Sequence, residues 1–354
     1  MCLRLIILMN KPFTNKILTW YDVNGRKDLP WKINPNPYSI WISEVMLQQT
    51  QVVTVIPYFL KFMDRFPSID VLARSQLDEV LGYWSGLGYY ARARNIYRAS
   101  RILYLDNKSI FPNSYDEIIK LPGIGRSTAG AILALAYKKK FSILDGNVKR
   151  VLSRYYRVKG TLEKASIQKK LWDLSDINTP TKSIAKYTQG IMDLGATICS
   201  RSKPKCNLCP LSINCLARIY HEQDLLPSKK LRQKKKKKDI NLVVIIDNEK
   251  SILLEKRQER GIWGGLYSFP EILDGQTCTS WVKEKLGINI NRIDKLPPIR
   301  HSLTHYDLLI KPNKIKLDSR LPETKNDEQL YWHKVPVDNN IGIAKPISSL
   351  INNL

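Results

Sequence analysis

The chain has 354 residues, of which 43% are hydrophobic, so it is long enough for two or three domains with substantial cores. Its 57 Lys and Arg against 32 Asp and Glu give a formal net charge of +25. That charge favours a polyanionic partner, with nucleic acid first and an anionic membrane surface second. No stretch is long and apolar enough for a membrane span and no export signal is recognised, so we expect a cytoplasmic protein. Met1 and Met9 are both candidate starts.

The first predicted helix runs from about Pro12 to Asn24. A rigid, extended loop containing Leu29-Pro30-Trp31-Lys32 follows, because Pro35-Asn36-Pro37 cannot lie inside a helix. Ser39 to Thr50 is the next predicted helix, and its positions are apolar over most of the circumference.

Glu44 is the first candidate catalytic residue. With Gln48 and Gln51 it follows the i, i+4, i+7 spacing of one polar stripe on this helix. Apolar neighbours such as Trp41 and Val45 desolvate the carboxyl group, and desolvation raises its pKa. Such a group can stay protonated near neutral pH and serve as a general acid. The alternative is a surface Glu on a half-buried helix.

Residues 56 to 120 are predicted as several helices with short loops. Within them, Trp84–Tyr90 and Ala91–Asn95 combine glycine, aromatic and arginine residues. Aromatic rings beside basic groups suit base stacking and phosphate contact. As a lone segment it could equally be a packed turn between two helices.

A glycine-marked turn, Leu121-Pro122-Gly123-Ile124-Gly125, precedes a helix predicted to begin at about Arg126. The first N–H groups of that helix and the positive end of its dipole form a ready phosphate site. A purely structural turn is the alternative.

Asp145, within Leu144-Asp145-Gly146-Asn147, stands where a helix N-cap is expected. N-caps are most often structural, but the helix N-terminus also stabilises a carboxylate as the anion. This environment is the opposite of that predicted for Glu44. Two carboxyl groups pushed to opposite protonation states are the pattern of an acid and an electrostatic stabiliser.

The cysteines Cys199, Cys206, Cys209 and Cys215 have the spacing C-x6-C-x2-C-x5-C. Without an export signal, this clustering indicates a metal site rather than disulfides. Four thiolates at this density hold zinc or an iron–sulfur cluster. Most zinc modules use two C-x2-C pairs and this chain has one, which favours a structural [4Fe–4S] cluster.

Residues 226–240 form a predicted basic linker, since eight of the ten residues from Lys229 to Lys238 are Lys or Arg. Such a run is usually solvated and disordered, and it could also follow a nucleic acid backbone. The segments after it predict an α/β domain of strands, turns and one helix. They are Leu242–Ile246, Ile252–Leu254, Trp263–Tyr267, Thr277–Leu286 and Arg300–Ile310.

Taken together, these motifs resemble the adenine DNA glycosylase family of the MutY type, whose relatives are endonuclease III and the other helix-hairpin-helix glycosylases. The matching stretches are Ser43–Gln51, Leu121–Gly130, Leu144–Val151, Met192–Gly195 before the four cysteines, and Trp263–Pro270. The resemblance implies an all-α helix-hairpin-helix glycosylase core with a [4Fe–4S] cluster over residues 1–225. It also implies a C-terminal α/β Nudix-like domain over residues 241–354 that recognises the mispair.

The resemblance implies a base-excision repair enzyme that flips adenine out of double-stranded DNA and cuts its N-glycosidic bond, leaving an abasic site. Its substrate would be adenine mispaired with 8-oxoguanine or guanine, and we expect a monomer associated with the nucleoid if the source is bacterial. Glu44 would protonate the adenine. Asp145 would stabilise the oxocarbenium-like sugar, with Asn147 nearby.

The other roles are also implied by the resemblance. Trp31, Lys32, Leu47 and Gln189 match positions that line the adenine pocket, although Lys32 stands where some relatives carry Arg. Gln49 and Tyr89 match positions that wedge into the duplex. Gly123, Gly125, Arg126 and Ser127 match the phosphate-binding turn.

Ser127 and residues of the C-terminal domain indicate which reactions to expect. Bifunctional relatives have a lysine at position 127, whose amine attacks the sugar, and serine cannot form that Schiff base. We therefore expect a monofunctional glycosylase. Leu303, Thr304 and His305 stand where many relatives have Phe-Ser-His for sensing 8-oxoguanine. The segment Thr279–Glu284 keeps one glutamate, so we do not expect nucleotide hydrolysis.

Two other functions compete with this interpretation. An endonuclease III-like glycosylase and lyase on oxidised pyrimidines is disfavoured by Ser127 and by the C-terminal domain. A non-catalytic iron–sulfur protein that binds DNA is disfavoured because both Glu44 and Asp145 are present.

Overall fold

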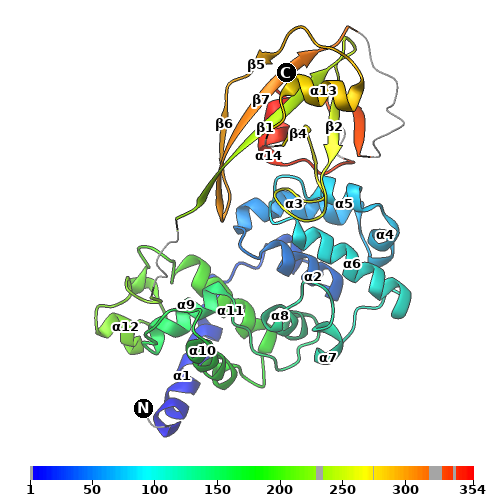
Figure 1. Cartoon of the computed structure of the whole chain (residues 1–354). Helices are drawn as coiled ribbons and strands as arrows, with labels where there is room; N and C mark the ends of the chain where they lie inside the picture. Colours follow the sequence, from blue (N-terminus) through cyan, green and yellow to red (C-terminus); the bar gives the residue numbers. More distant parts are fainter. Residues whose placement is uncertain (1–2, 229–233, 274, 319–328, 338–339) are drawn as a thin grey trace. The chain divides into compact units, whose positions relative to one another are not determined.

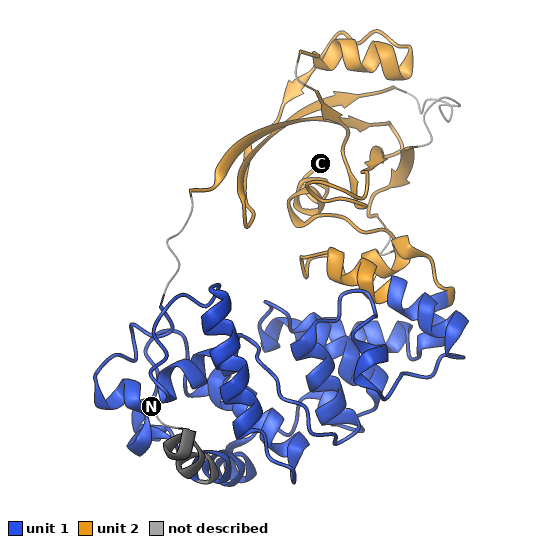
Figure 2. Cartoon of the chain, turned by 60° about the horizontal axis from the view of Figure 1, so that its bottom comes forward, with its two compact units in different colours: residues 1–73, 98–232 blue, residues 74–97, 233–354 orange. Residues whose placement is uncertain are grey.

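A computed structural model describes residues 3–228, 234–273, 275–318, 329–337 and 340–354, with side chains from residue 12 onward. Met1, one of the two candidate starts, and residues 229–233 of the predicted linker lie outside these ranges. The chain divides into two compact units (Figure 2). The first contains residues 1–73 and 98–232, and the second contains residues 74–97 and 233–354.

The first unit is helical (Figure 1), as the sequence predicts. Its elements are α1 (Leu3–Asn24), η1 (Pro30–Lys32), α2 (Pro37–Met46), α3 (Val52–Arg65), α4 (Ile69–Arg74), α6 (Ala91–Asp106, whose first residues belong to the second unit), α7 (Tyr115–Ile118), α8 (Arg126–Ala136), α9 (Gly146–Tyr155), α10 (Ala165–Asn178), α11 (Ile184–Thr197), η2 (Cys206–Leu208), η3 (Ser212–Asn214) and α12 (Leu216–Ile219). Among the described residues, no helix has both the length and the apolar character needed to cross a membrane.

Helix α11 packs against α1, α8 and α9, and this packing contributes to one hydrophobic core of the first unit. The core buries Phe13 and Ile17 of α1, Val148 and Leu152 of α9, and Leu194 of α11. Burying side chains of this size stabilises a fold by about 1.5–3 kcal/mol each. The core therefore fixes α9, which begins after its N-cap Asp145, and α11, which is followed by the loop with the four cysteines.

Helix α2 differs from its prediction at both ends. It begins at Pro37, because proline is tolerated in the first turn and Asn36 forms a capping box with Ser39. It ends at Met46 rather than Thr50, because the backbone of Gln49 has φ 58°, which no right-handed helix can contain. The predicted polar stripe of Glu44, Gln48 and Gln51 is therefore wrong.

The second unit contains an eight-stranded mixed sheet within the described residues. Its elements are α5 (Leu77–Tyr83), β1 (Lys236–Ile246), β2 (Ser251–Lys256), β3 (Tyr267–Ser268), β4 (Glu271–Ile272), α13 (Cys278–Leu286), β5 (Asp294–Lys295), β6 (Ile299–Ser302), β7 (Tyr306–Lys316), β8 (Leu330–Lys334) and α14 (Lys345–Ile351). The predicted helix at Thr277–Leu286 is confirmed, with Thr277 as its N-cap.

The path through the sheet is β3-β2-β1-β7-β5, and β4, β6 and β8 pair with β1, β7 and β2. Strands β1 and β7 run parallel from the pair Lys236–Tyr306 to the pair Ile246–Lys316. Strand β1 thus begins at Lys236, inside the segment predicted as linker, and not at Leu242. Helix α13 covers one face of the sheet, where Trp281 packs into a core with Val243.

Candidate active site

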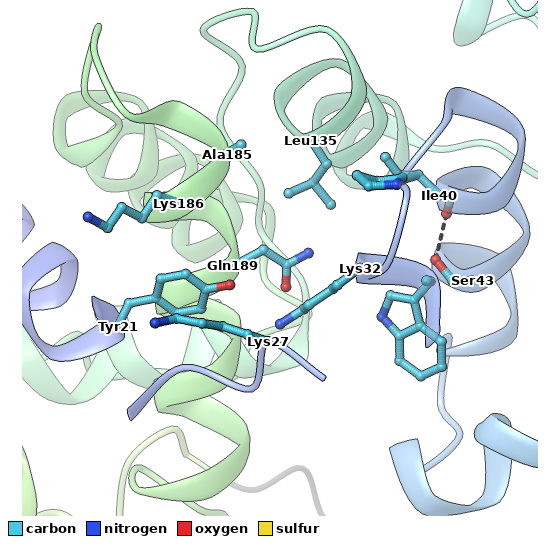
Figure 3. A pocket seen from close by; sticks show the side chains of 11 residues that line it. Tyr21, Lys27, Lys32, Ile40, Ser43, Leu135, Ala185, Lys186 and Gln189 are labelled. Atoms are coloured by element: carbon cyan, nitrogen blue, oxygen red, sulfur yellow. Dashed lines mark hydrogen bonds between the residues drawn. The ribbon is translucent and has the colours of Figure 1, made fainter. Parts of the chain in front are cut away.

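A cavity of about 250 Å³ lies among α1, η1, α2, α8 and α11 of the first unit (Figure 3). Trp31, Lys32 and Gln189, predicted to contact a base, all line it. Leu47, the C-cap of α2, was also predicted to line it but is not among the lining residues. The remaining lining residues, which no sequence motif had marked as a pocket, are Tyr21, Lys27, Pro35, Ile40, Ser43, Leu135, Ala185 and Lys186.

Glu44 follows Ser43 on α2 and is half-buried, between the fully buried Ser43 and Val45. Burial raises the pKa of the Glu44 carboxyl group to about 7, and the nearby charge of Asp145 adds to this effect. The ammonium group of Lys32, which lines the cavity, acts in the opposite direction. The fold therefore supplies a carboxylic acid that holds its proton near neutral pH, as the sequence predicts for a general acid.

Asp145 is the N-cap of α9, as predicted. Its Oδ1 accepts the N–H of Val148 at 2.8 Å, and its Oδ2 accepts the side-chain amide of Asn147 at 3.1 Å. Burial nevertheless raises the pKa of Asp145, while these hydrogen bonds and Arg150 lower it. The net direction is upward, opposite to the N-cap expectation, because desolvation outweighs the capping bonds. The charge of Asp145 acts on Glu44, so the two carboxyl groups, distant in sequence, lie within electrostatic range of each other.

Arg150 is a site residue that the sequence did not reveal. It donates hydrogen bonds to Oδ1 of Asn147 at 2.9 Å and to the carbonyl of Cys199 at 2.6 Å. It also donates to the carbonyl of Gly195. A Cβ at Gly195 would stand 2.7 Å from that of Asn147, so α11 needs a glycine there. The start of α9 is thus held in place from the side of α11.

The turn before α8 has the predicted geometry for an anion. Gly123 has φ 80°, and Gly125 is the N-cap of α8. The first hydrogen bond within α8 runs from Ala129 N–H to Gly125 C=O, so the N–H groups before Ala129 are not used inside the helix. Arg126 contacts the ring of Trp172 at 3.8 Å.

The hydroxyl of Ser127 accepts the backbone N–H of Leu144 at 3.0 Å. Position 127 is therefore beside the residue that precedes Asp145. The serine has a structural role at this point, because its bond joins the start of α8 to the turn that contains Asp145.

Asp193, whose side chain is 2% exposed, is held by two cations. Arg26 donates its Nε to Oδ1 of Asp193 at 2.9 Å, and Lys32 donates its Nζ to Oδ2 at 3.1 Å. Burial lowers the pKa of Lys32, and Asp193 opposes that shift. The motif Met192–Gly195 marks this residue in the sequence, but its role is visible only in the fold.

The four predicted cysteine ligands lie on the loop after α11, and Cys199, Cys209 and Cys215 pack against the core of the first unit. The four thiols are free and lie close enough to influence one another: burial raises the pKa of Cys209 to about 12, and the charges of the other three add to this effect. Arg154 donates a hydrogen bond to Sγ of Cys199 at 3.3 Å. No compact set of three or more His, Cys, Asp or Glu ligands for a metal ion occurs within the described ranges. The donor chemistry, four thiols and a neighbouring guanidinium group, fits a cluster with thiolate ligands.

The two predicted wedge residues share an unusual backbone. Gln49 in the first unit has φ 58° and is exposed. Tyr89 in the second unit has φ 51°, and its side chain is 47% exposed. A positive φ is uncommon for residues with a side chain and marks functional or strained positions.

Leu303, Thr304 and His305 form the hairpin tip between β6 and β7, where the N–H of Leu303 donates to the carbonyl of Tyr306 at 2.8 Å. Thr304 and His305 are exposed, whereas Leu303 is half-buried. The hydroxyl and imidazole groups are thus available at the tip.

Two family profiles match the chain. The HhH-GPD superfamily base excision DNA repair protein profile matches residues 42–176, and the NUDIX domain profile matches residues 241–353. Adenine DNA glycosylase of Buchnera aphidicola subsp. Acyrthosiphon pisum (strain APS) is 44% identical over 341 residues, which cover 96% of this chain and 97% of the relative. The human adenine DNA glycosylase is 36% identical over 223 residues, which cover 60% of this chain and 41% of the human protein.

The solved structures support the fold of the helical part. A thermostable thymine-DNA glycosylase matches with a TM-score of 0.54 and 28% identity, over 60% of this chain and 97% of that protein. A non-covalent endonuclease III–DNA complex matches with a TM-score of 0.53 and 19% identity, over 61% of this chain and 97% of that protein. The predicted fold class, a helix-hairpin-helix core with a C-terminal Nudix-like domain, is confirmed.

Proposed function

Since the chain belongs to the adenine DNA glycosylase family, it is a DNA N-glycosylase that removes adenine in base-excision repair, and we propose that its substrate is adenine opposite 8-oxoguanine or guanine. The observation that carries the proposal is that the charges of Asp145 and of Lys32, which lines the cavity, both act on the carboxyl group of Glu44. The cavity has room for a single base extruded from the duplex.

In the proposed reaction, the protonated carboxyl group of Glu44 transfers its proton to the adenine, which then leaves as a neutral base. The anionic Asp145 stabilises the positive charge that develops on the sugar, and Asn147 fixes the orientation of that carboxylate. A water molecule then adds to the sugar cation and gives a proton back to the Glu44 carboxylate, which leaves an abasic site. The hydrogen bonds to Asp145 support this division of roles, because they lower its pKa and so oppose the larger effect of burial.

The remaining assignments follow the same division. Trp31, Lys32 and Gln189 line the cavity and would contact the adenine. For Leu47, the resemblance of the sequence motif is the basis for the same role. Backbone N–H groups from Gly123 to Ser127, with Arg126, would bind a phosphate. Gln49 and Tyr89 would enter the duplex, and the tip Leu303–His305 would read the opposite base. We assign the glycosylase chemistry to residues 1–225 and mispair recognition to residues 241–354, whose first strand extends back to Lys236, in a monomer that acts in the cytoplasm.

The first test uses a duplex with adenine opposite 8-oxoguanine. Ser127 has no amine for a Schiff base and its hydroxyl is engaged by Leu144, so we expect strand scission only after alkali treatment. Gel electrophoresis of the labelled adenine strand, with and without alkali, measures both steps.

Duplexes with adenine opposite guanine or thymine, and with an oxidised pyrimidine, complete this experiment. Release opposite thymine as fast as opposite 8-oxoguanine would refute the mispair specificity. A nick without alkali, or cleavage at the oxidised pyrimidine, would favour the endonuclease III-like alternative.

The four cysteines Cys199, Cys206, Cys209 and Cys215 would hold one [4Fe–4S] cluster, which when bound would secure the loop that Arg150 and Arg154 contact. We expect about four iron and four sulfide ions per purified chain. Cys199→Ser should lower the iron content. Cys278→Ser is the matched control, since this cysteine lies in the second unit and should leave iron unchanged. A zinc-loaded protein without iron would contradict the assignment.

A further inference from the structure

Residues 74–97 belong to the same compact unit as the C-terminal residues, although the HhH-GPD match spans them (Figure 2). They contain α5, the glycine-rich turn after it and the start of α6. Tyr89, the exposed residue proposed to enter the duplex, lies in this turn. The contacts between the segment and the C-terminal residues can therefore act on Tyr89.

The first contact joins the turn to residue 343. The hydroxyl of Ser85 donates to the carbonyl of Ile343 at 2.6 Å, and the hydroxyl of Tyr90 donates to the same carbonyl at 3.3 Å. The Tyr90 hydroxyl also accepts the N–H of Gly86 at 3.0 Å. The carbonyl of Gly342 accepts the N–H of Tyr267 at 2.8 Å, so strand β3 holds the acceptor segment in place.

A second set of contacts holds the helices on either side of the turn. On α5, Asp78 pairs with Nζ of Lys256 at 2.7 Å. On α6, Nη1 of Arg94 donates to the carbonyl of Gly264 at 2.7 Å. Leu81 of α5 packs so closely on Gly342 that an added Cβ there would lie 2.7 Å from the Leu81 Cβ. The turn is thus fixed at both flanks and at its middle.

The turn itself needs such support. Gly86, Gly88 and Tyr89 have φ values of 96°, 78° and 51°. The carbonyl of Gly88 accepts hydrogen bonds from Nε1 of Trp84 and from Arg92, each at 3.1 Å. A left-handed conformation at a bulky residue persists only when the surroundings impose it. The internal bonds and the C-terminal contacts together meet that condition.

We infer that the C-terminal residues brace the turn of residues 84–90 and so position Tyr89 for insertion into the duplex. Ser85, Tyr90 and Asp78 are then positioning residues, which act on the DNA through Tyr89. The C-terminal part of the chain thereby contributes to base extrusion as well as to reading the opposite base. This inference rests on the proposed function for the role of Tyr89.

The test is a double-mutant cycle in the full chain. Ser85→Ala removes the two hydrogen bonds between its hydroxyl and the backbone of Ile343 and should slow single-turnover adenine release at least about fivefold, since one lost hydrogen bond has an effect of about 1 kcal/mol. In the Tyr89→Ala background, the same substitution should change the rate less than about twofold, because the group it positions is absent. Asp78→Asn should show the same dependence on Tyr89, which keeps the test available if Ser85→Ala fails to fold.

A second readout does not require turnover. In the Glu44→Gln background, a duplex with 2-aminopurine opposite 8-oxoguanine reports base extrusion through its fluorescence, and Ser85→Ala should lower that signal. Ser349→Ala, an exposed serine of α14, is the matched control and should change neither readout. The inference would be overturned if Ser85→Ala slowed adenine release by the same factor with Tyr89 and with Tyr89→Ala. It would also be overturned if neither Ser85→Ala nor Asp78→Asn changed the rate. A wild-type protein that releases no adenine would instead refute the proposed function, and the fluorescence would still test the brace.

Discussion

Glu44→Gln is expected to abolish adenine release and to leave binding of the mispaired duplex largely intact. The amide preserves the size of the side chain but has no proton to transfer to the base. Because general acids contribute about 10²–10⁴-fold, single-turnover release should fall by about 10³-fold. Gel-based kinetics at saturating enzyme measure the rate, and a binding titration of the same duplex measures affinity.

The pH dependence of the same residue gives an independent check. Since the pKa of Glu44 is raised to about 7, release by the wild-type enzyme should decline as pH rises through this value. The unfolded chain ionises first, near 4.5, so the stability contributed by the protonated group is present below that pH and is lost as pH rises to about 7. At pH 8, Glu44→Gln should therefore be more stable than wild type by about 3 kcal/mol.

Urea unfolding at pH 5 and pH 8 measures this difference, which should be small at the lower pH. Glu163→Gln, an exposed glutamate just before α10, is the matched control and should not change stability or rate. Unchanged turnover in Glu44→Gln would remove the residue from the acid role. A variant that is no more stable than wild type at pH 8 would show that the carboxyl group is not desolvated.

Asp193→Asn should cause the second large effect, a loss of folding stability of about 3 kcal/mol. The substitution removes the anion that Arg26 and Lys32 share, and Lys32 is only 10% exposed, so its charge would be left without compensation in a buried place. Arg26 is 28% exposed, so water can solvate part of its charge, and the loss of stability should lie at the lower end of the range for a broken buried ion pair. Urea unfolding at neutral pH measures the change.

The rate should fall as well, because Lys32 lines the cavity and its charge acts on Glu44. Asp22→Asn is the matched control: Asp22 pairs with Lys186 on the surface, where ion pairs contribute little. If Asp193→Asn unfolds like the control, the buried pair does not stabilise this fold.

Local chemistry explains what the sequence could predict. The N-cap role of Asp145 and the start of α8 after Gly125 depend on residues within one turn, and both are found. The predicted end of α2 at Thr50 is wrong because Gln49 adopts a left-handed conformation, which is not expected from a glutamine in the sequence.

Contacts distant in sequence could not be predicted from the residues alone. The closeness of Glu44 and Asp145, the ion pairs of Asp193 and the bonds of Arg150 arise from helix packing. Likewise, the grouping of residues 74–97 with the C-terminal residues depends on hydrogen bonds such as that of Ser85 with Ile343. The raised pKa of Asp145 also could not be predicted, because it results from burial, and the extent of that burial depends on the tertiary fold.

The bond between the Ser127 hydroxyl and the Leu144 N–H has a consequence for how reaction type can diverge in this superfamily. A lysine at 127 would supply an amine nucleophile, but it has no acceptor atom for that N–H. The backbone just before Asp145 would then lose an anchor at the moment the new chemistry was gained. Exchanging Ser127 for lysine in this chain would thus change two linked features at once, because it would add a reactive amine and remove a support for the turn that contains Asp145.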